Sequence, residues 1–277
     1  MIDGHTHLIA HIGFPTHSFK APLIYNPYFD AVGINAVVVP MGVPRTDFAQ
    51  AFPVIARFSN FHGALITMPH KVAIVPMLDR VSTAVSVAGA CNAVRRAADG
   101  ALVGDMFDGE GFARGVLRKG RRIAGASALI VGAGGVGSAI AAALAAHGLA
   151  HLRLHDTDRV AATGLAARLV AHYPALSVEV GTPDPTGMAL AVNATPSGMS
   201  DGDPLPMAVD RLAAETLVGE VVMRAEITPF LRAALDRGCA VQVGTDMLFE
   251  QIPAYLEFFG FPTTNADHLR QLARFTP

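Results

Sequence analysis

Apolar residues occur along the chain in two recurring arrangements, which together predict an alternation of strands and helices. Short apolar runs bounded by Gly, Pro or polar residues are typical of buried strands, and apolar residues repeated every three or four positions are typical of helices. We expect strands at residues 7–13, 36–41, 63–68, 89–94, from 102, 128–131, 151–156, 177–180, 190–193, 216–223 and 240–243. We expect helices after the loop 15–22, at 46–58, from 69–71, and at 108–117, 138–147, 158–172, 228–237, 246–259 and 265–274.

The regular alternation in the second half of the chain predicts a doubly wound parallel α/β sheet of the Rossmann type. The first half predicts a separate α/β domain. The basic turn at residues 118–122 is the natural boundary between them. We therefore expect one domain at 1–118, completed by 246–277 because the last helices can pack back onto it, and a second domain at 119–245.

A cluster of glycines stands between an apolar run and an alanine-rich run at residues 128–144. Gly132, Gly134 and Gly137 have the G-x-G-x-x-G spacing of a strand, a tight turn and a helix that bind a dinucleotide. The first glycine permits the turn, the second lets backbone approach a pyrophosphate, and the third lets helix and strand pack closely. Asp156 ends the next predicted strand, about 20 residues further on, where a ribose-binding carboxylate is expected.

The composition is that of a globular, enzyme-like protein. The 277 residues are 51% hydrophobic and carry a net charge of −2, which gives no reason to expect nucleic acid or an anionic membrane as partner. Residues 123–152 lack charged side chains other than histidine, but six glycines interrupt them, so we reject a membrane span. Two cysteines and an N-terminus without a signal-peptide pattern favour a reducing compartment, the cytoplasm.

His5 and His7 form a His-x-His pair of the kind that supplies two metal ligands. A metallohydrolase barrel needs further ligands at the ends of later strands and eight strand-helix repeats, which the chain does not show. We therefore expect no metal site, and we expect the two histidines to lie in a solvated terminus.

Six stretches of the chain follow one another in an order that is more specific than any one of them. They are Gly63-Ala-Leu-Ile-Thr67-Met-Pro69-His-Lys71, Gly89-Ala-Cys-Asn92, Gly104-x-x-x-Asp108-x-x-Gly111-Phe112, the glycine cluster, Asn193-Ala-Thr195-Pro196-Ser-Gly-Met199 and Gly244-x-x-Met247-Leu248-x-x-Gln251. In this order the chain resembles the shikimate dehydrogenase family from about residue 9 to residue 260.

The resemblance implies an NAD(P)-dependent dehydrogenase with an N-terminal substrate domain and a C-terminal nicotinamide domain. Lys71, which by itself would be taken as a surface lysine, would form the catalytic pair with Asp108 and handle the hydroxyl proton while hydride passes to nicotinamide. Which of the two accepts the proton stays open. Thr67, Asn92 and Gln251 would hydrogen-bond substrate hydroxyls. The implied cofactor-binding residues are Gly132, Gly134, Gly135, Val136, Gly137, Asp156, Thr195, Pro196, Val221, Gly244 and Met247.

The loop after the first strand departs from the family pattern. If Pro22 is the anchor, Phe19 and Ala21 stand where the family has two serines that bind the substrate carboxylate. Ser18 and Lys20 remain as candidate substrate-binding residues, and we expect Lys20 to replace the serines as the partner of a carboxylate.

Three further departures also remove polar groups. Leu65 and Met106 stand where the family has asparagines, and Met223 stands where it has a tyrosine. A pocket built to hydrogen-bond a polyol loses discrimination by as much as ~10⁴-fold when its donors are lost. We therefore expect shikimate itself to be a poor substrate or none.

The end of the strand after the glycine cluster indicates the cofactor. Family members that use NADP carry Asn-Arg-Thr there, whereas this chain has Asp156, Thr157 and Asp158. A carboxylate binds a ribose 2′-hydroxyl and repels a 2′-phosphate, so NAD is favoured over NADP, although Arg159 is close enough in sequence to accommodate a phosphate.

The leading hypothesis is an NAD-dependent dehydrogenase that acts on a secondary alcohol of a small cyclic hydroxy acid related to shikimate or quinate. We expect a monomer or a homodimer. A methylenetetrahydrofolate dehydrogenase shares the two-domain plan and a lysine, but the six stretches have the other family's spacing. A different class of function is an NAD-binding metabolite sensor, which the lost polar contacts favour and the retained Lys71 and Asp108 oppose.

Overall fold

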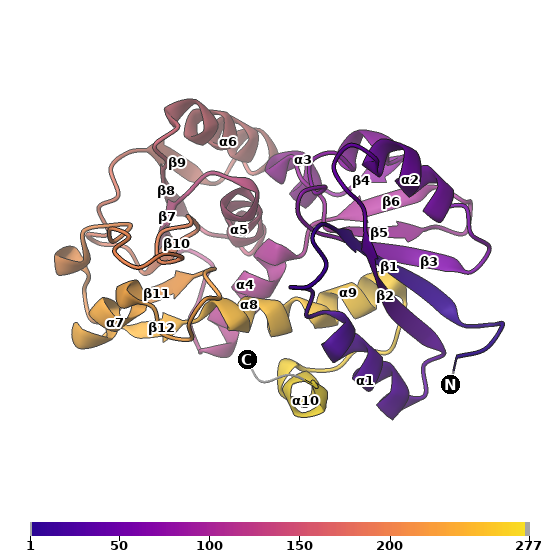
Figure 1. Ribbon diagram of the computed structural model, residues 1–277. Coiled ribbons are helices and arrows are strands. Elements are labelled where there is room, and N and C mark those ends of the chain that lie inside the picture. Colours follow the sequence, from indigo (N-terminus) through magenta and orange to yellow (C-terminus); the bar gives the residue numbers. More distant parts are fainter. Residues whose placement is uncertain (1, 275–277) are drawn as a thin grey trace. The chain divides into compact units, whose positions relative to one another are not determined.

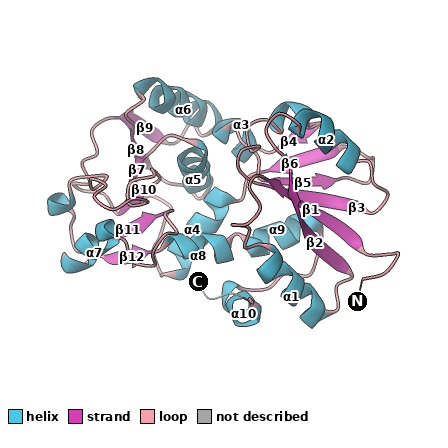
Figure 2. Cartoon of the chain, in the orientation of Figure 1, coloured by secondary structure: helices cyan, strands magenta, loops and turns pink. Residues whose placement is uncertain are grey.

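A computed structural model describes residues 2–274 of the chain, which fold into two compact units (Figure 1). The first unit contains the residues up to Val85, Gly89–Phe107 and the residues from Ile252 onward. The second contains Ser86–Ala88 and Asp108–Gln251. Each unit has its own sheet covered by helices (Figure 2).

The first unit is built on a mixed six-stranded sheet with the order β2-β1-β3-β5-β6-β4. Its elements are β1 (His7–Gly13), α1 (Pro22–Val32), β2 (Ala36–Gly42), α2 (Phe48–Ile55), β3 (Phe61–Ile66), the 3₁₀ helix η1 (Val75–Met77), β4 (Arg80–Val81), β5 (Ala93–Arg96), β6 (Leu102–Asp105), α9 (Ile252–Phe259) and α10 (Ala266–Leu272). Strand β1 pairs in parallel with β2 and β3, and β5 is antiparallel to β3 and β6. The carboxyl ends of β1 and β3 therefore lie at the same edge.

The second unit is built on a six-stranded, wholly parallel sheet with the order β12-β11-β10-β7-β8-β9. Its elements are α4 (Asp108–Arg118), β7 (Ser127–Val131), α5 (Gly135–Ala146), β8 (His151–His155), α6 (Arg159–His172), β9 (Ser177–Val180), β10 (Leu190–Asn193), the 3₁₀ helix η2 (Val209–Arg211), β11 (Leu217–Glu220), α7 (Pro229–Asp236), β12 (Ala240–Gln242) and α8 (Gly244–Glu250). Helix α3 (Thr83–Ala88) spans the division between the units. The strand order is that of a Rossmann fold, which confirms the predicted class.

The central strand β7 shows why the sheet is covered on both faces. Ala128 and Ile130 pack into a core with α4, α5 and α6, whereas Leu129 and Val131 pack into a second core with α7. Successive side chains of a strand point to opposite faces, so an unbroken apolar run is what a doubly covered parallel strand requires.

The last two helices pack in the first unit. Helix α10 contacts α1, and the Tyr28 hydroxyl of α1 donates to the Pro262 carbonyl at 2.7 Å. His62 of β3 is hydrogen-bonded through Nε2 to the Phe259 carbonyl at 2.7 Å. The predicted helix 246–259 is, however, two helices, α8 and α9, which belong to different units.

Two sequence predictions in the first unit are wrong. No helix begins at residues 69–71; the chain forms turns there, because the Lys71 carbonyl accepts from the Cys91 N–H at 2.8 Å instead of continuing a helical ladder. The stretch 89–94 is not one strand. Gly89 ends helix α3 with a left-handed φ of 66°, and strand β5 begins only at Ala93.

The observed division between the units differs from the expected boundary at residue 118 by one helix. Helix α4 belongs to the second unit because it packs on α5 and α8. Two ion pairs join its C-terminal end to α8: Arg118 to Glu250 at 2.6 Å, and Lys119 to Asp246 at 2.9 Å. Two residues of the basic turn, Arg118 and Lys119, therefore form ion pairs within the second unit.

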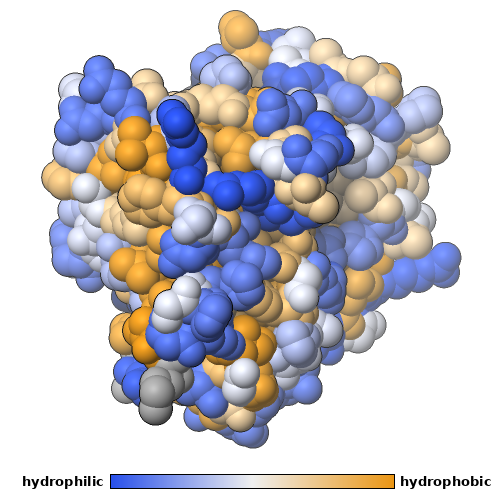
Figure 3. Space-filling view, turned by 90° about the vertical axis from the view of Figure 1, so that its right-hand side faces the viewer, coloured by the Kyte–Doolittle hydropathy of each residue, from blue (hydrophilic) through white to orange (hydrophobic). Residues whose placement is uncertain are grey.

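The helices of the described residues include none that is long and apolar enough to cross a bilayer. On the face shown in Figure 3, hydrophilic residues are interspersed with hydrophobic ones.

Candidate functional site

The glycine loop lies at the carboxyl end of β7 and leads directly into α5. Gly132 has a φ of 109°, a conformation that glycine adopts without strain. A Cβ at Gly134 or Gly135 would meet no atom within 4 Å, so the backbone there is open to a ligand. A Cβ at Gly137 would overlap the Gly132 carbonyl oxygen. Open N–H groups at the start of a twelve-residue helix are suited to a phosphate.

Gly137→Ala is expected to lower the free energy of unfolding by about 1–3 kcal/mol, because the added methyl must displace the Gly132 backbone. Urea denaturation of the protein without cofactor measures this effect. Gly135→Ala is the matched control, since it adds the same methyl to the same helix where nothing lies within 4 Å. Equal stability of the two variants would contradict the close packing of loop and helix.

Asp156 follows β8 and turns its carboxylate back onto the glycine loop. Its Oδ2 accepts from the Ala133 N–H at 2.6 Å, and its Oδ1 accepts from the Asp158 N–H at 2.8 Å. Both bonds are made by backbone groups, so the carboxylate is fixed in place beside the loop. The loop and the acid are separated by about 20 residues in sequence but are in direct contact in the fold.

The ends of β10 and β11 complete the same edge of the sheet. At the end of β10, the Asn193 Oδ1 accepts from the Thr195 hydroxyl at 2.6 Å, and Ala194 and Thr195 pack beside Gly132, with Pro196 following in the chain. After β11, Val221 lies against Gly244, where α8 begins. Met247 belongs to the apolar core between the sheet and α4, α5 and α6, and Val136 and Val221 pack against that core. The candidate cofactor residues of this unit therefore converge.

These residues fit a nicotinamide dinucleotide. The loop offers unhindered N–H groups for the pyrophosphate, Asp156 offers a carboxylate for a ribose, and Val221 and Met247 offer apolar surface next to Gly244.

Thr67, Lys71 and Asn92 are brought together in the first unit at the carboxyl end of β3. The Thr67 N–H donates to the Ile12 carbonyl at 2.9 Å, and the Ile66 N–H next to it donates to the Asn92 carbonyl at 2.8 Å. The bond between the Lys71 carbonyl and the Cys91 N–H brings the lysine beside the same segment. The Asn92 side chain also binds the Phe107 N–H through Oδ1 at 2.9 Å.

The two other candidate substrate-binding residues of this unit lie in the loop between β1 and α1. Ser18 is exposed and Lys20 is half-buried. The loop is folded into turns, in which the Phe19 N–H donates to the Thr16 carbonyl at 3.0 Å. The Phe19 ring stacks on His11 of β1, with 4.0 Å between the ring centroids.

Asp108 and Gln251 both belong to the second unit. Asp108 is buried as the first residue of α4, and Gly111, one turn later, packs directly against Gln251. The Gln251 Oε1 is buried and has no hydrogen-bond partner. A buried amide oxygen of this kind is suited to a hydroxyl of a bound ligand. Asp108 thus belongs to the second unit and Lys71 to the first.

Sequence reasoning missed His11, which is buried on β1 near Lys71. Burial and, to a lesser degree, the charge of Lys71 lower the pKa of His11 from 6.5 to about 4. The signal in the sequence is an imidazole inside the apolar run 8–12, and its proximity to Lys71 is visible only in the folded structure.

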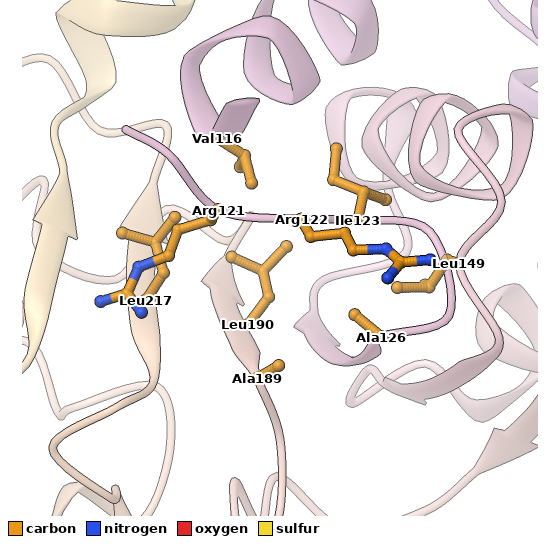
Figure 4. A pocket seen from close by; sticks show the side chains of 9 residues that line it. All are labelled: Val116, Arg121, Arg122, Ile123, Ala126, Leu149, Ala189, Leu190 and Leu217. Atoms are coloured by element: carbon orange, nitrogen blue, oxygen red, sulfur yellow. The ribbon is translucent and has the colours of Figure 1, made fainter. Parts of the chain in front are cut away.

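One small cavity lies away from these residues, at the amino ends of β7, β10 and β11 (Figure 4). Its volume is about 10 Å³, and side chains such as Val116, Leu190 and Leu217 line it together with Arg121 and Arg122. This is room for about one water molecule, so the cavity is no substrate site. Within residues 2–274, no group of three or more His, Cys, Asp or Glu side chains is placed to hold a metal ion.

Known protein families match a segment of each unit. The shikimate dehydrogenase substrate binding domain family matches residues 12–94, and the ThiF family matches residues 113–175. A shikimate dehydrogenase (NADP(+)) of Rubrobacter xylanophilus is 36% identical over 90% of this chain and 89% of its own.

Solved structures show the same similarity. Shikimate 5-dehydrogenase from Listeria monocytogenes, in complex with shikimate and NAD, superposes with a TM-score of 0.90 at 25% identity, over 98% of this chain and 97% of that one. The ligand-free 5-ketofructose reductase of Gluconobacter sp. strain CHM43 gives a TM-score of 0.88 at 26% identity, over 98% and 99%. The chain belongs to the shikimate dehydrogenase family, and it is an NAD(P)-dependent oxidoreductase that acts on CH–OH groups.

Proposed function

We propose that the protein transfers hydride between NAD and a secondary alcohol of a small cyclic hydroxy acid, with Lys71 and Asp108 handling the proton. The observation that carries this proposal is the clustering of Lys71 with Thr67 and Asn92 at the end of β3, in a chain whose second unit holds an open glycine loop. The protein acts in the cytoplasm, as a monomer or a homodimer.

Different residues are proposed for proton transfer and for substrate orientation. NAD, when bound, supplies the hydride acceptor. In this proposal the Lys71 ammonium or amine and the Asp108 carboxylate take up and return the hydroxyl proton, and a positioned acid-base pair accelerates such a transfer by about 10²–10⁴-fold. Thr67, Asn92 and Gln251 orient the substrate through hydroxyl and amide groups, so that the reacting C–H is held in place.

NAD is proposed over NADP because of Asp156. Its carboxylate is fixed on the glycine loop by the Ala133 N–H, where it suits a ribose 2′-hydroxyl and repels a phosphate. The Listeria relative binds NAD, whereas the Rubrobacter relative is named for NADP.

The proposed substrate carries fewer hydroxyls than shikimate or differently placed ones. Leu65 and Met106 are 5% and 3% exposed, so the positions where the family has asparagines are apolar and buried in this protein. If Pro22 anchors the loop, Phe19 stands where the family has a carboxylate-binding serine, and its ring stacks on His11. Lys20 remains the proposed partner of the substrate carboxylate.

The test is an assay of NADH formation with NAD and a panel of shikimate, quinate and less hydroxylated cyclic hydroxy acids. We expect turnover with at least one panel member and a lower kcat/KM for shikimate than for that member. NAD binding measured by calorimetry, with no turnover across the whole panel, would instead favour a metabolite sensor.

A further inference from the structure

His11 lies on the same face of the first sheet as the proposed substrate-binding residues. It pairs with Leu65 in the parallel register of β1 and β3, and paired residues of adjacent strands point to the same side. Two residues on along β1, a Cβ at Gly13 would overlap the side chains of Thr67 and Phe19. His11, Phe19, Leu65 and Thr67 therefore share one face at the carboxyl ends of the strands.

The His11 imidazole is a buried polar group that the fold itself does not satisfy. The residue is 7% exposed, its ring stacks on Phe19, and its Nδ1 has no hydrogen-bond partner. His70, which is also buried, is anchored through Nε2 to the Val43 carbonyl at 2.7 Å. Buried polar groups are usually paired, so an imidazole without an anchor beside Lys71 has a partner to gain from a ligand.

The protonation state of the His11 imidazole indicates which chemical group of a ligand it can hydrogen-bond. Its pKa of about 4 keeps His11 neutral at physiological pH, and the side chains that face it, Phe19 and Leu65, are uncharged, with Lys71 nearby. A neutral imidazole has one N–H donor and one acceptor nitrogen. Such a group matches a hydroxyl or carbonyl oxygen, whereas a carboxylate would call for a cationic partner.

We propose that His11 is a specificity-determining residue whose imidazole hydrogen-bonds an uncharged oxygen, hydroxyl or carbonyl, of the cyclic substrate beside Lys71. The inference rests on the proposed function and deepens it. In this arrangement the polar contact comes from β1 in place of β3, where Leu65 has no polar group to offer.

The test compares His11→Val, His11→Gln and the control His7→Val with wild type. His7 is an exposed histidine at the start of the same strand, so the control makes the same chemical change away from the site. The probes are quinate, shikimate and 3-hydroxycyclohexanecarboxylate, with NAD. We expect His11→Val to raise KM for the best probe by roughly 10-fold or more with kcat within a few-fold, because a substrate hydrogen bond is lost. His11→Gln, which keeps a donor and an acceptor, recovers part of this loss, and His7→Val changes neither constant.

A second variant separates binding from packing. Leu65→Asn places an amide on the paired position of the same face, so it is expected to restore KM in the His11→Val background. Lower thermal stability of His11→Val with an unchanged KM would overturn the inference and leave the proposed function standing. No turnover and no calorimetric binding of any of the three probes by wild type would overturn both.

Discussion

Lys71→Met is expected to lower kcat by about 10²–10⁴-fold while the dissociation constant for NAD stays within a few-fold of wild type. Methionine keeps the length and the apolar stem of the side chain but removes the group that moves the proton. The backbone bond from the Cys91 N–H to the Lys71 carbonyl does not depend on the side chain, so the local turns persist. Steady-state kinetics with the best panel substrate and calorimetry with NAD measure the two quantities separately.

Lys119→Met is the matched control for this prediction. Lys119 pairs with Asp246 on the surface of the second unit and takes no part in proton transfer, so kcat is expected to stay within a few-fold. Asp108→Asn is expected to lower kcat as Lys71→Met does, and the double variant to be little worse than either single one, because groups that act as a unit are strongly non-additive. Fully additive losses would show that the two residues act in different steps.

The second unit could be predicted closely because its strands are defined by local pattern. The runs 177–180 and 190–193 match β9 and β10 residue for residue. Strand β10 is a short apolar run because it is buried in the parallel sheet, whereas β9, at the edge of the sheet, alternates polar and apolar residues. Two of the wrong predictions, the helix at 69–71 and the strand at 89–94, lie in the first unit. The turns around Lys71 depend on the bond to Cys91, which joins residues 20 positions apart in sequence, and no local pattern contains it.

The candidate site shows the same limit in its side chains. Gly132 to Gly137 and Asp156 can be identified from spacing alone, because the physical requirements of a dinucleotide loop fix those residue types. His11 cannot. Its role follows from a cross-strand register with Leu65 and a stack with Phe19, and both are properties of the folded sheet rather than of the neighbouring sequence.

Asp156→Asn is expected to lower the ratio of kcat/KM with NAD to kcat/KM with NADP by about 10²-fold or more. Asparagine keeps an oxygen that can accept from the Ala133 N–H, so the loop stays anchored while the negative charge is removed. Two like charges about 4 Å apart near a protein surface repel by up to about 4 kcal/mol, which is enough for a change of this size. Both constants come from the same steady-state assay with the best panel substrate.

The cofactor ratio of wild type decides what the Asp156 carboxylate does. A clear preference for NAD that Asp156→Asn removes would assign it to recognition of the ribose. Arg159, exposed at the start of α6, is the control position, because Arg159→Ala in the Asp156→Asn background should weaken NADP use only if that arginine binds the 2′-phosphate. A wild-type preference for NADP, unchanged in Asp156→Asn, would contradict the prediction. The bonds to Ala133 and Asp158 would then be the whole role of the carboxylate, and NAD would have to be replaced by NADP in the proposed reaction.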